Sequence, residues 1–428
     1  MELHGDSLAG LTNWAGNHAY GAARIHEPES IDQLQEIVRD TRPLRVLGSR
    51  HSFNDIADTT GHLLSLRRMP RVFELDRAAG TLTVDGGVRY GELAAPLDAA
   101  GFALNNLASL PHISVAGACA TATHGSGDQI GNLATAVSAL EVVTADGETT
   151  VFVRDGDADG LNGAVVSLGG LGVVISLTLD LQRTFRVRQD LYERLPLLQA
   201  VDNFDKITSN ADSVSLFTNW REPIVDQVWL KRRVPAGDTY EPAPEFFGAT
   251  IATVPIHPIR RMSTAALTEQ LGVPGPWHER LPHFRMDHMP SSGAELQTEY
   301  LIPRQHAPEA LLAVDGIRDR FAAVLQISEV RTIAADDLWM STAFGRASVA
   351  FHFTWLPDWG AVRRVLPDIE NALAPFDPRP HWGKVFTMSP EAIRSSYEKL
   401  PLFAALLERH DPTGKFRNAF LTRYIFAE

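Results

Sequence analysis

The chain has 428 residues, of which 44% are hydrophobic, and it carries a formal net charge of -13 with a single cysteine, Cys119. This length suits two or three domains with real hydrophobic cores, and the acidic balance argues against a nucleic-acid partner or a polyanionic ligand, since both need a basic surface. One cysteine excludes an internal disulfide, and neither a leader peptide nor a membrane-spanning apolar run is recognisable, so we expect a cytoplasmic protein without a membrane anchor.

The first part of the chain alternates short helices with strands. A helix is expected over residues 30–38, because Ser30 and Gln33 have the spacing of a capping box and apolar residues recur on one face. In chain order the pattern then predicts a strand at 44–47, a hairpin of strands 72–75 and 81–84, a helix over 91–100, a hairpin of strands 140–144 and 149–153, and a strand over 171–179. We place a domain boundary near residue 183.

The second part has longer strands and a loop-like passage from 242 to about 290 that is rich in proline and glycine. An antiparallel sheet carrying helices is the architecture that this pattern favours. The expected strands lie near 214–220, 227–231, 294–301, 326–333 and 348–356, and the expected helices over 308–325 and 361–373.

Several common cofactor and metal motifs are broken in this sequence. Two glycine segments, 125–131 and 170–172, come nearest to the G-x-G-x-x-G motif of a Rossmann fold, and both depart from it. His278 and His283 are five residues apart with a proline between them, so they do not share a helical face as a zinc motif requires. A conventional dinucleotide fold is therefore disfavoured, and we expect no metal site.

Two polar segments together predict one cofactor site. In residues 44–55, Gly48 and Ser49 allow a sharp turn after the strand and aim backbone amides outward, as loops that bind phosphate groups do. His51 follows at a position where a cofactor can be touched. Taken alone this is an ordinary strand-to-loop turn, but residues 109–127 add a second segment of the same polar, glycine-containing kind.

In the second part, the alternation of side chains along a strand groups polar residues on one face. A solvated sheet face is the ordinary explanation of such a group. This set of donors and acceptors also suits a floor that binds hydroxyl groups. The residues so grouped are Glu329 with Arg331, His352 with Thr354, and Gln297 with Glu295 and Glu299.

The chain resembles the vanillyl-alcohol oxidase family of flavoproteins and, within it, the bacterial alditol oxidases (xylitol or sorbitol oxidases). The resemblance runs from Asn13 to the C-terminus and is carried by motifs in the family's order: residues 48–52, residues 114–117 with 123–125, residues 381–384, and residues 411–418. It implies an α+β fold of two domains. Their expected bounds are 1–183 for a PCMH-type FAD-binding domain, 184–383 for an antiparallel-sheet substrate cap, and 384–428 for a C-terminal segment that returns to the FAD domain.

The resemblance also implies site residues. His51 matches the family histidine that bonds covalently to the flavin 8α-methyl group, although Arg50 stands where many relatives carry glycine, and arginine is less easily placed at positive φ. The residues matching the loops that wrap FAD are Val46, Leu47, Gly48, Ser49, Arg50, His51, Ser52, Ser109, Ser114, Gly117, Thr121, Ala122, Thr123, His124 and Ile175. Those matching the polyol pocket are Ser109, Gln297, Glu329, Arg331, His352, Thr354 and Lys384.

The implied activity is oxidation of the terminal primary hydroxyl of a polyol such as xylitol or sorbitol to the aldose, by hydride transfer to flavin N5, with oxygen reduced to hydrogen peroxide. We expect Arg331 and Lys384 to stabilise the developing alkoxide. Glu329 and His352 are expected to orient the hydroxyls, and one of them to accept the proton. An aldonolactone oxidase or dehydrogenase of the same family is the alternative enzyme, and a carbohydrate- or flavin-binding protein without turnover is the alternative outside enzymes. We expect a monomer.

Overall fold

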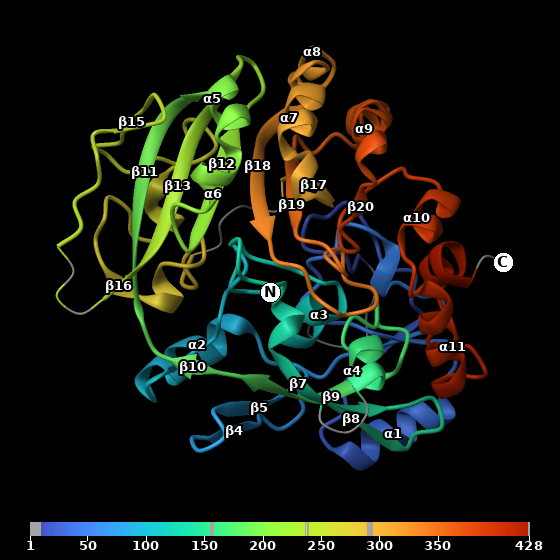
Figure 1. The fold of residues 1–428 in the computed structure, drawn as a ribbon. Helices are drawn as coiled ribbons and strands as arrows, with labels where there is room; N and C mark the ends of the chain where they lie inside the picture. The colour runs from blue at the N-terminus through green and yellow to red at the C-terminus, as the bar shows by residue number, and fades with distance from the viewer. Residues whose placement is uncertain (1–9, 155–157, 236, 238, 289–293, 427–428) are drawn as a thin grey trace.

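The computed structural model describes residues 10–154, 158–235, 237, 239–288 and 294–426. Its strands form a ten-stranded sheet, a five-stranded sheet and two smaller sheets (Figure 1). The ten-stranded sheet, with helices on one side of it, lies above the five-stranded sheet in the view of Figure 1. The fold is therefore α+β with a large antiparallel sheet, as the sequence predicts.

The first part of the chain is built on the five-stranded antiparallel sheet, with strand order β4-β5-β9-β7-β8. Both predicted hairpins are confirmed, since β4 pairs with β5 and β7 pairs with β8. The strands are β4 (Phe73–Asp76), β5 (Thr81–Asp85), β7 (Val137–Val143), β8 (Thr149–Val153) and β9 (Val173–Asp180). A two-stranded sheet pairs β6 (Phe102–Ala103) with β10 (Gln182–Arg183).

A small parallel sheet leads into the turn that contains His51. Its order is β1-β3-β2, and its strands are β1 (Arg24–His26), β2 (Leu44–Val46) and β3 (His62–Leu64). The predicted helix is α1 (Ile31–Asp40), in which the Ser30 side chain accepts a hydrogen bond from Gln33 N. The Gln33 side chain accepts from Glu29 N, one residue before the cap, so the reciprocal half of the capping box does not form. Further helices in this part are α2 (Tyr90–Ala99), α3 (Val115–Ala120) and α4 (Ala158–Ala164).

The large sheet has the path β14-β15-β11-β13-β12-β18-β19-β17-β20, with β16 paired to β11, and its strand pairs are antiparallel. Every long strand predicted after residue 183 is present in it. The strands are β11 (Arg186–Pro196), β12 (Ser213–Thr218), β13 (Ile224–Val234), β14 (Glu245–Phe246), β15 (Ala249–Ile251), β16 (Gly275–Pro276), β17 (Leu296–Pro303), β18 (Leu325–Ile333), β19 (Ser348–Trp355) and β20 (Arg379–Pro380). Between 242 and 288 the described chain is mostly irregular, as predicted, apart from β14, β15 and β16.

Helices cover one face of this sheet (Figure 1). The predicted helix over 308–325 is wrong in its second half: α7 ends at Asp315, Gly316 caps it, and Ile317 leaves the helical region with φ -113, before the short α8. Residue 325 already belongs to β18, because Leu325 is paired with β19. The helices are α5 (Leu197–Asp202), α6 (Phe204–Thr208), α7 (Ala307–Asp315), α8 (Arg318–Phe321) and α9 (Trp359–Leu373).

The C-terminal segment packs against the five-stranded sheet. Phe403, Leu407 and Phe420 belong to the same hydrophobic cluster as Leu82 of β5 and Leu177 of β9, and Figure 1 shows these last helices beside the N-terminal half. They are α10 (Pro390–Ser396), α11 (Leu400–His410) and α12 (Ala419–Leu421). In the part of the chain that the structure describes, no helix combines the length and apolar character needed to span a bilayer.

Candidate functional site

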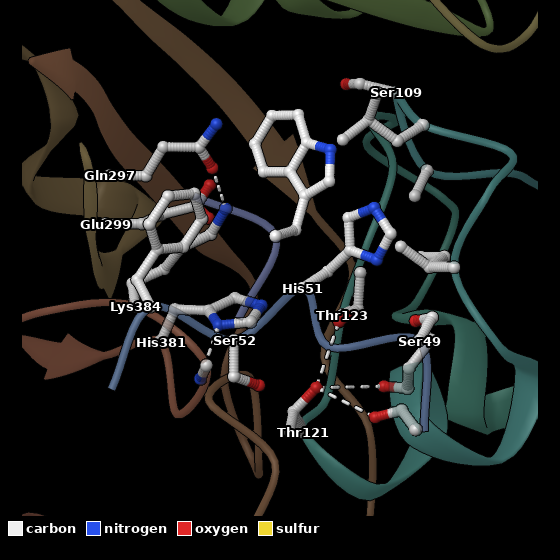
Figure 2. Close-up of a pocket in the computed structure, with 18 of the residues that line it drawn as sticks. Ser49, His51, Ser52, Ser109, Thr121, Thr123, Gln297, Glu299, His381 and Lys384 are labelled. Atoms are coloured by element: carbon white, nitrogen blue, oxygen red, sulfur yellow. Dashed lines mark hydrogen bonds between the residues drawn. The ribbon is translucent and has the colours of Figure 1, made fainter. Parts of the chain in front are cut away.

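A cavity of about 480 Å³ lies where the two halves of the molecule meet. It is lined by the turn after β2, by residues of the 108–124 segment, and by side chains of β17, β18 and β19. In Figure 2, Lys384, Gln297 and Glu299 lie to the left of His51, while Ser49, Thr121 and Thr123 lie below it. The volume is in the range of small-molecule and cofactor pockets.

The residue before His51 adopts a backbone conformation that favours glycine. Arg50 has φ 62, a conformation that glycine adopts without strain and arginine does not. Hydrogen bonds from the N-terminal segment compensate, since Trp14 N donates to Arg50 O over 2.8 Å and Arg50 Nη1 donates to Thr12 O over 3.1 Å. Arg50 therefore adopts the turn conformation, and its hydrogen bonds connect the turn to residues 12–14.

His51 lines the cavity as a neutral imidazole. Burial, together with the nearby His112, lowers the pKa of His51 to about 4. The Trp14 ring stacks on it with ring centroids 5.4 Å apart and planes inclined by 21°. Its Nδ1 atom is buried and has no hydrogen-bond partner among the described residues. A buried imidazole nitrogen without a hydrogen-bond partner is costly to leave unsatisfied, and in the tautomer that leaves it unprotonated it can form a covalent bond to a cofactor.

Gly48 and Gly117 both line the cavity, and both lie close to the Ser114 side chain. A Cβ atom on Gly48 would lie 2.9 Å from Ser114 Oγ, and one on Gly117 would lie 2.7 Å from the same atom. Ser114 Oγ is itself buried without a partner among the described residues, whereas Ser114 N donates to Ser49 Oγ over 3.1 Å. The unsatisfied atoms of His51 and Ser114 thus both lie where the two polar segments meet, as a cofactor held between them requires.

Thr121 and Thr123 line the same side, with their hydroxyl oxygens 3.1 Å apart. Of the predicted FAD-contacting residues, Ala122 and Ile175 do not line the cavity. Ala122 is fully buried with φ 53 and turns the chain between the two threonines. Ile175 lies within β9, where its carbonyl accepts a hydrogen bond from Gly86 N over 2.9 Å.

The predicted polar face of the sheet forms the other wall. Register pairs Glu299 of β17 with His352 of β19, and pairs the same His352 with Glu329 of β18, so the three lie in one row across neighbouring strands. Gln297 pairs with Thr354 one step further along. The solvated-face explanation is wrong here, because Glu299 and Glu329 are only 2% and 4% exposed. The alternate residues of β19 pack on the helix side: Val349, Phe351, Phe353 and Trp355.

Arg331 connects this wall to the loop that carries Ser109. Its Nη2 atom donates to Glu299 Oε1 over 2.7 Å, and Nη1 donates to Ser109 Oγ over 3.4 Å. Burial lowers the pKa of Arg331, but the charges of Glu329 and Glu299 outweigh it and raise the pKa above its ordinary value. For Glu299 burial is likewise outweighed, by His124 and Arg331, which hold the pKa of its carboxyl well below its usual range. The cavity therefore contains fixed opposite charges.

Lys384 brings a second cation to the cavity. Its Nζ atom donates to Gln297 Oε1, and it lies 5.0 Å from the centre of the Phe53 ring. The Asn54 side chain holds the backbone of this loop by donating to Lys384 O over 2.8 Å. Burial, opposed by the charge of Glu299, lowers the pKa of Lys384 to about 8, so it remains mostly cationic at neutral pH.

His352 differs from the charged groups around it. Burial lowers its pKa to about 3, so the ring is neutral at neutral pH. Its side chain makes no hydrogen bond to any described residue, and it lines the cavity. Unlike Glu299 and Arg331, it is therefore available to hydrogen-bond a ligand.

The structure adds residues that sequence reasoning did not select. Glu299, His381 and His283 all line the cavity. Glu299 was grouped with Gln297 on the polar face, and His381 lies in the 381–384 motif, so both had a signal that was not carried to a site assignment. His283 had none, because it lies in the irregular passage and reaches Glu329 only through the fold.

Residues 22–152 match the family described as "FAD binding domain", and residues 289–424 match the family described as "D-arabinono-1,4-lactone oxidase". The chain is 52% identical to an alditol oxidase from Streptomyces sp., over 96% of this chain and 98% of that protein. It is 29% identical to an L-gulono-1,4-lactone dehydrogenase from Mycobacterium tuberculosis, over 97% of this chain and 98% of that protein. The crystal structure of cholesterol oxidase from B. sterolicum has the same fold, with a TM-score of 0.77, 13% identity, and coverage of 97% and 96% of the two chains.

Proposed function

This chain belongs to the alditol oxidases of the vanillyl-alcohol oxidase family of flavoproteins, and from that premise we propose that it oxidises the terminal primary hydroxyl of a polyol such as xylitol or sorbitol to the aldose. The chemistry that FAD supplies when bound is acceptance of a hydride at N5 and return of the electrons to oxygen as hydrogen peroxide. The lactone-oxidising alternative is less favoured, since the lactone dehydrogenase is the more distant relative.

We propose that FAD is held by the two polar segments and linked covalently through His51. The buried, unpaired Nδ1 of His51 and the buried, unpaired Oγ of Ser114 support this placement. Gly48 and Gly117 both line the cavity, and a Cβ on either would crowd Ser114 Oγ, so glycine at these positions lets the two polar segments meet closely around the cofactor. The division into an FAD-binding domain (1–183), a cap (184–383) and a returning segment (384–428) belongs to the same proposal.

The observation that carries the proposed activity is the row of Glu299, His352 and Glu329 lying beside Arg331 and Lys384 in the cavity that His51 also lines. An alditol is uncharged, so it must be recognised by hydrogen bonds to its hydroxyls rather than by a charge clamp. Carboxylates, an imidazole, an amide and two cations offer the acceptors and donors that such a chain of hydroxyls needs.

Within this site, we assign to Arg331 and Lys384 the stabilisation of negative charge that develops on the reacting oxygen as its proton leaves. Glu329 orients hydroxyls as an acceptor. His352 accepts the proton, because its ring is neutral and makes no hydrogen bond to other described residues, whereas Glu329 is hydrogen-bonded to His283. Gln297, Thr354 and Ser109 complete the polyol contacts.

The decisive test is to mix the purified protein with xylitol without oxygen, to follow the flavin absorbance, and then to admit air. Bleaching, followed by recovery of the yellow colour with formation of peroxide, supports the proposal. Bleaching by an aldonolactone and not by xylitol would assign the lactone activity instead. Bleaching by neither would favour a binding protein without turnover. The monomeric state and the cytoplasmic location stay predictions from the sequence.

A further inference from the structure

Behind the wall of the cavity that β17, β18 and β19 form, a buried chain of hydrogen bonds runs from Glu329 through His283 to Lys231. His283 Nε2 lies 2.8 Å from Glu329 Oε1, and His283 Nδ1 lies 3.0 Å from Lys231 Nζ. The three side chains belong to different parts of the cap: Lys231 to β13, His283 to the irregular passage before residue 289, and Glu329 to β18. Lys231, His283 and Glu329 are 1%, 7% and 4% exposed, so this is a buried network and not a surface ion pair.

Lys231 is fixed in this position by its own partners. Besides His283 Nδ1, its Nζ atom donates to Leu281 O over 2.5 Å and to Pro282 O over 3.1 Å. Three acceptors match the three protons of an ammonium group. Burial lowers the pKa of Lys231 to about 7, but the ammonium and the neutral amine both carry N–H groups, so Lys231 can donate to His283 in either state.

Donation by Lys231 decides which nitrogen of His283 carries the proton. Burial and the charge of Lys231 lower the pKa of His283 to about 4, so the ring is neutral at neutral pH. A neutral imidazole has one donor and one acceptor nitrogen. Because Nδ1 accepts from Lys231, Nε2 carries the hydrogen and donates it to Glu329 Oε1. The rings of Trp229 and Phe217, with centroids 5.1 Å and 5.6 Å from that of His283, restrict its rotation.

The arrangement leaves the two oxygens of Glu329 different. Oε1 is held by His283, whereas Oε2 lies 3.6 Å from Arg331 Nε, too far for a hydrogen bond, and accepts none from the described residues. Glu329 lines the cavity, so Oε2 is the oxygen left for a ligand. The segment that carries His283 also bonds to the opposite wall, since His283 N donates to Ser109 O over 3.1 Å.

We propose that Lys231 and His283 are positioning residues that set the affinity for the polyol, by holding Glu329 through Oε1 so that Oε2 is presented to a substrate hydroxyl. The inference rests on the proposed polyol oxidation. Neither residue touches the reacting atoms in this account. Their loss therefore weakens substrate binding more than it slows the chemical step, because a misplaced acceptor is lost from the ground state and the transition state alike.

The first test is Lys231→Met, which keeps the volume of the side chain and removes its donors. We expect the KM for xylitol to rise about tenfold or more, as the loss of a hydrogen bond in a charged network implies, while kcat falls by a smaller factor. Lys415→Met is the matched control, since Lys415 is also buried and donates to backbone carbonyls of Val38 and Arg39, but it does not line the cavity. The control is expected to lower stability and to leave KM unchanged.

A second pair of variants keeps the test decisive if Lys231→Met does not fold. In His283→Gln the side-chain amide can donate to Glu329 and its carbonyl can accept from Lys231, whereas His283→Phe keeps an aromatic ring and removes both functions. We expect His283→Phe to raise KM strongly and His283→Gln to restore most of the affinity.

Equal KM values in the two His283 variants, or an unchanged KM in a folded Lys231→Met protein, overturn the inference. A purely structural role would lower stability in every variant without this split between KM and kcat. Wild-type protein that oxidises no polyol would instead refute the proposed function, so the two failures are distinguishable.

Discussion

Arg331 Nη2 and Glu299 Oε1 lie 2.7 Å apart, with the two side chains 7% and 2% exposed. The same carboxylate oxygen lies 3.3 Å from Nε2 of His124, which directly follows Thr123 in the segment that forms the opposite side of the cavity. Glu299 thus joins the cation of the sheet wall to the loop opposite, across the boundary between the two halves. An ion pair this deeply buried is costly to break from one side, because the remaining charge loses its partner and gains no water.

We expect Glu299→Gln to lower the free energy of unfolding by about 2 kcal/mol, because Arg331 loses a charged hydrogen-bond partner and keeps only the carboxylate of Glu329, 3.6 Å away. Urea denaturation monitored by tryptophan fluorescence measures it. Asp368→Asn serves as control, since Asp368 pairs with Arg320 at the surface, where the side chains are 33% and 62% exposed. Surface pairs contribute at most about 1 kcal/mol. Similar losses in both variants would contradict the importance assigned to Glu299.

Sequence reasoning reached this site because strand alternation is a local property. The face shared by Glu329 and Arg331, and that shared by His352 and Thr354, follow from a period of two and are present as predicted. Which strands are neighbours is not local. The row joining Glu299, His352 and Glu329 depends on β18 and β17 flanking β19, and no pattern in the sequence states that order.

Contacts made by irregular segments could not be predicted from the sequence for the same reason. His283 was considered only for its spacing from His278, but its function depends on a backbone path that brings it to Glu329. The break between α7 and α8 was missed because the apolar pattern continues across Gly316 and Ile317, where the chain leaves the helix. At Arg50, by contrast, the sequence already raised the question of a positive φ, and the structure contains one.

His51→Ala tests the covalent link. We expect its flavin to be absent or to be released by acid precipitation, because the substitution removes the buried nitrogen that has no other partner among the described residues. The measurement is flavin absorbance in the pellet and the supernatant after precipitation. His306→Ala, which replaces a histidine on η5 (Arg304–His306) that does not line the cavity, should keep its flavin in the pellet. Flavin that stays with the precipitated His51→Ala protein would exclude His51 as the attachment site.

Lys384→Ala should slow flavin reduction by xylitol about 100-fold or more, the size of effect seen when one preorganised donor to a developing oxyanion is removed. Its thermal unfolding temperature should change little by comparison. Stopped-flow absorbance under anaerobic conditions gives the rate. An unchanged rate would remove Lys384 from the mechanism.

The pH dependence of reduction tests the charge of Lys384 separately. Its pKa is lowered to about 8, so the group is cationic below that pH and neutral above it. As pH rises through about 8, the wild-type reduction rate should lose the contribution of this cation. Lys384→Arg should not show that loss, because a guanidinium remains protonated throughout the range. The same alkaline fall in both proteins would assign it to another group.

Replacing His352 and Glu329 one at a time distinguishes the proton acceptor from the orienting residue. If His352 accepts the hydroxyl proton, His352→Gln should lower the limiting rate of flavin reduction about 100- to 10,000-fold, the usual range for loss of a general base, with a smaller change in KM. Glu329→Gln keeps the shape of the side chain and loses the negative charge, so its main effect should be a higher KM. Anaerobic reduction over a range of xylitol concentrations separates the two parameters. The reverse pattern would make Glu329 the base. His283 and Lys231 would then hold the base itself in place, and their variants should lower the limiting rate as well.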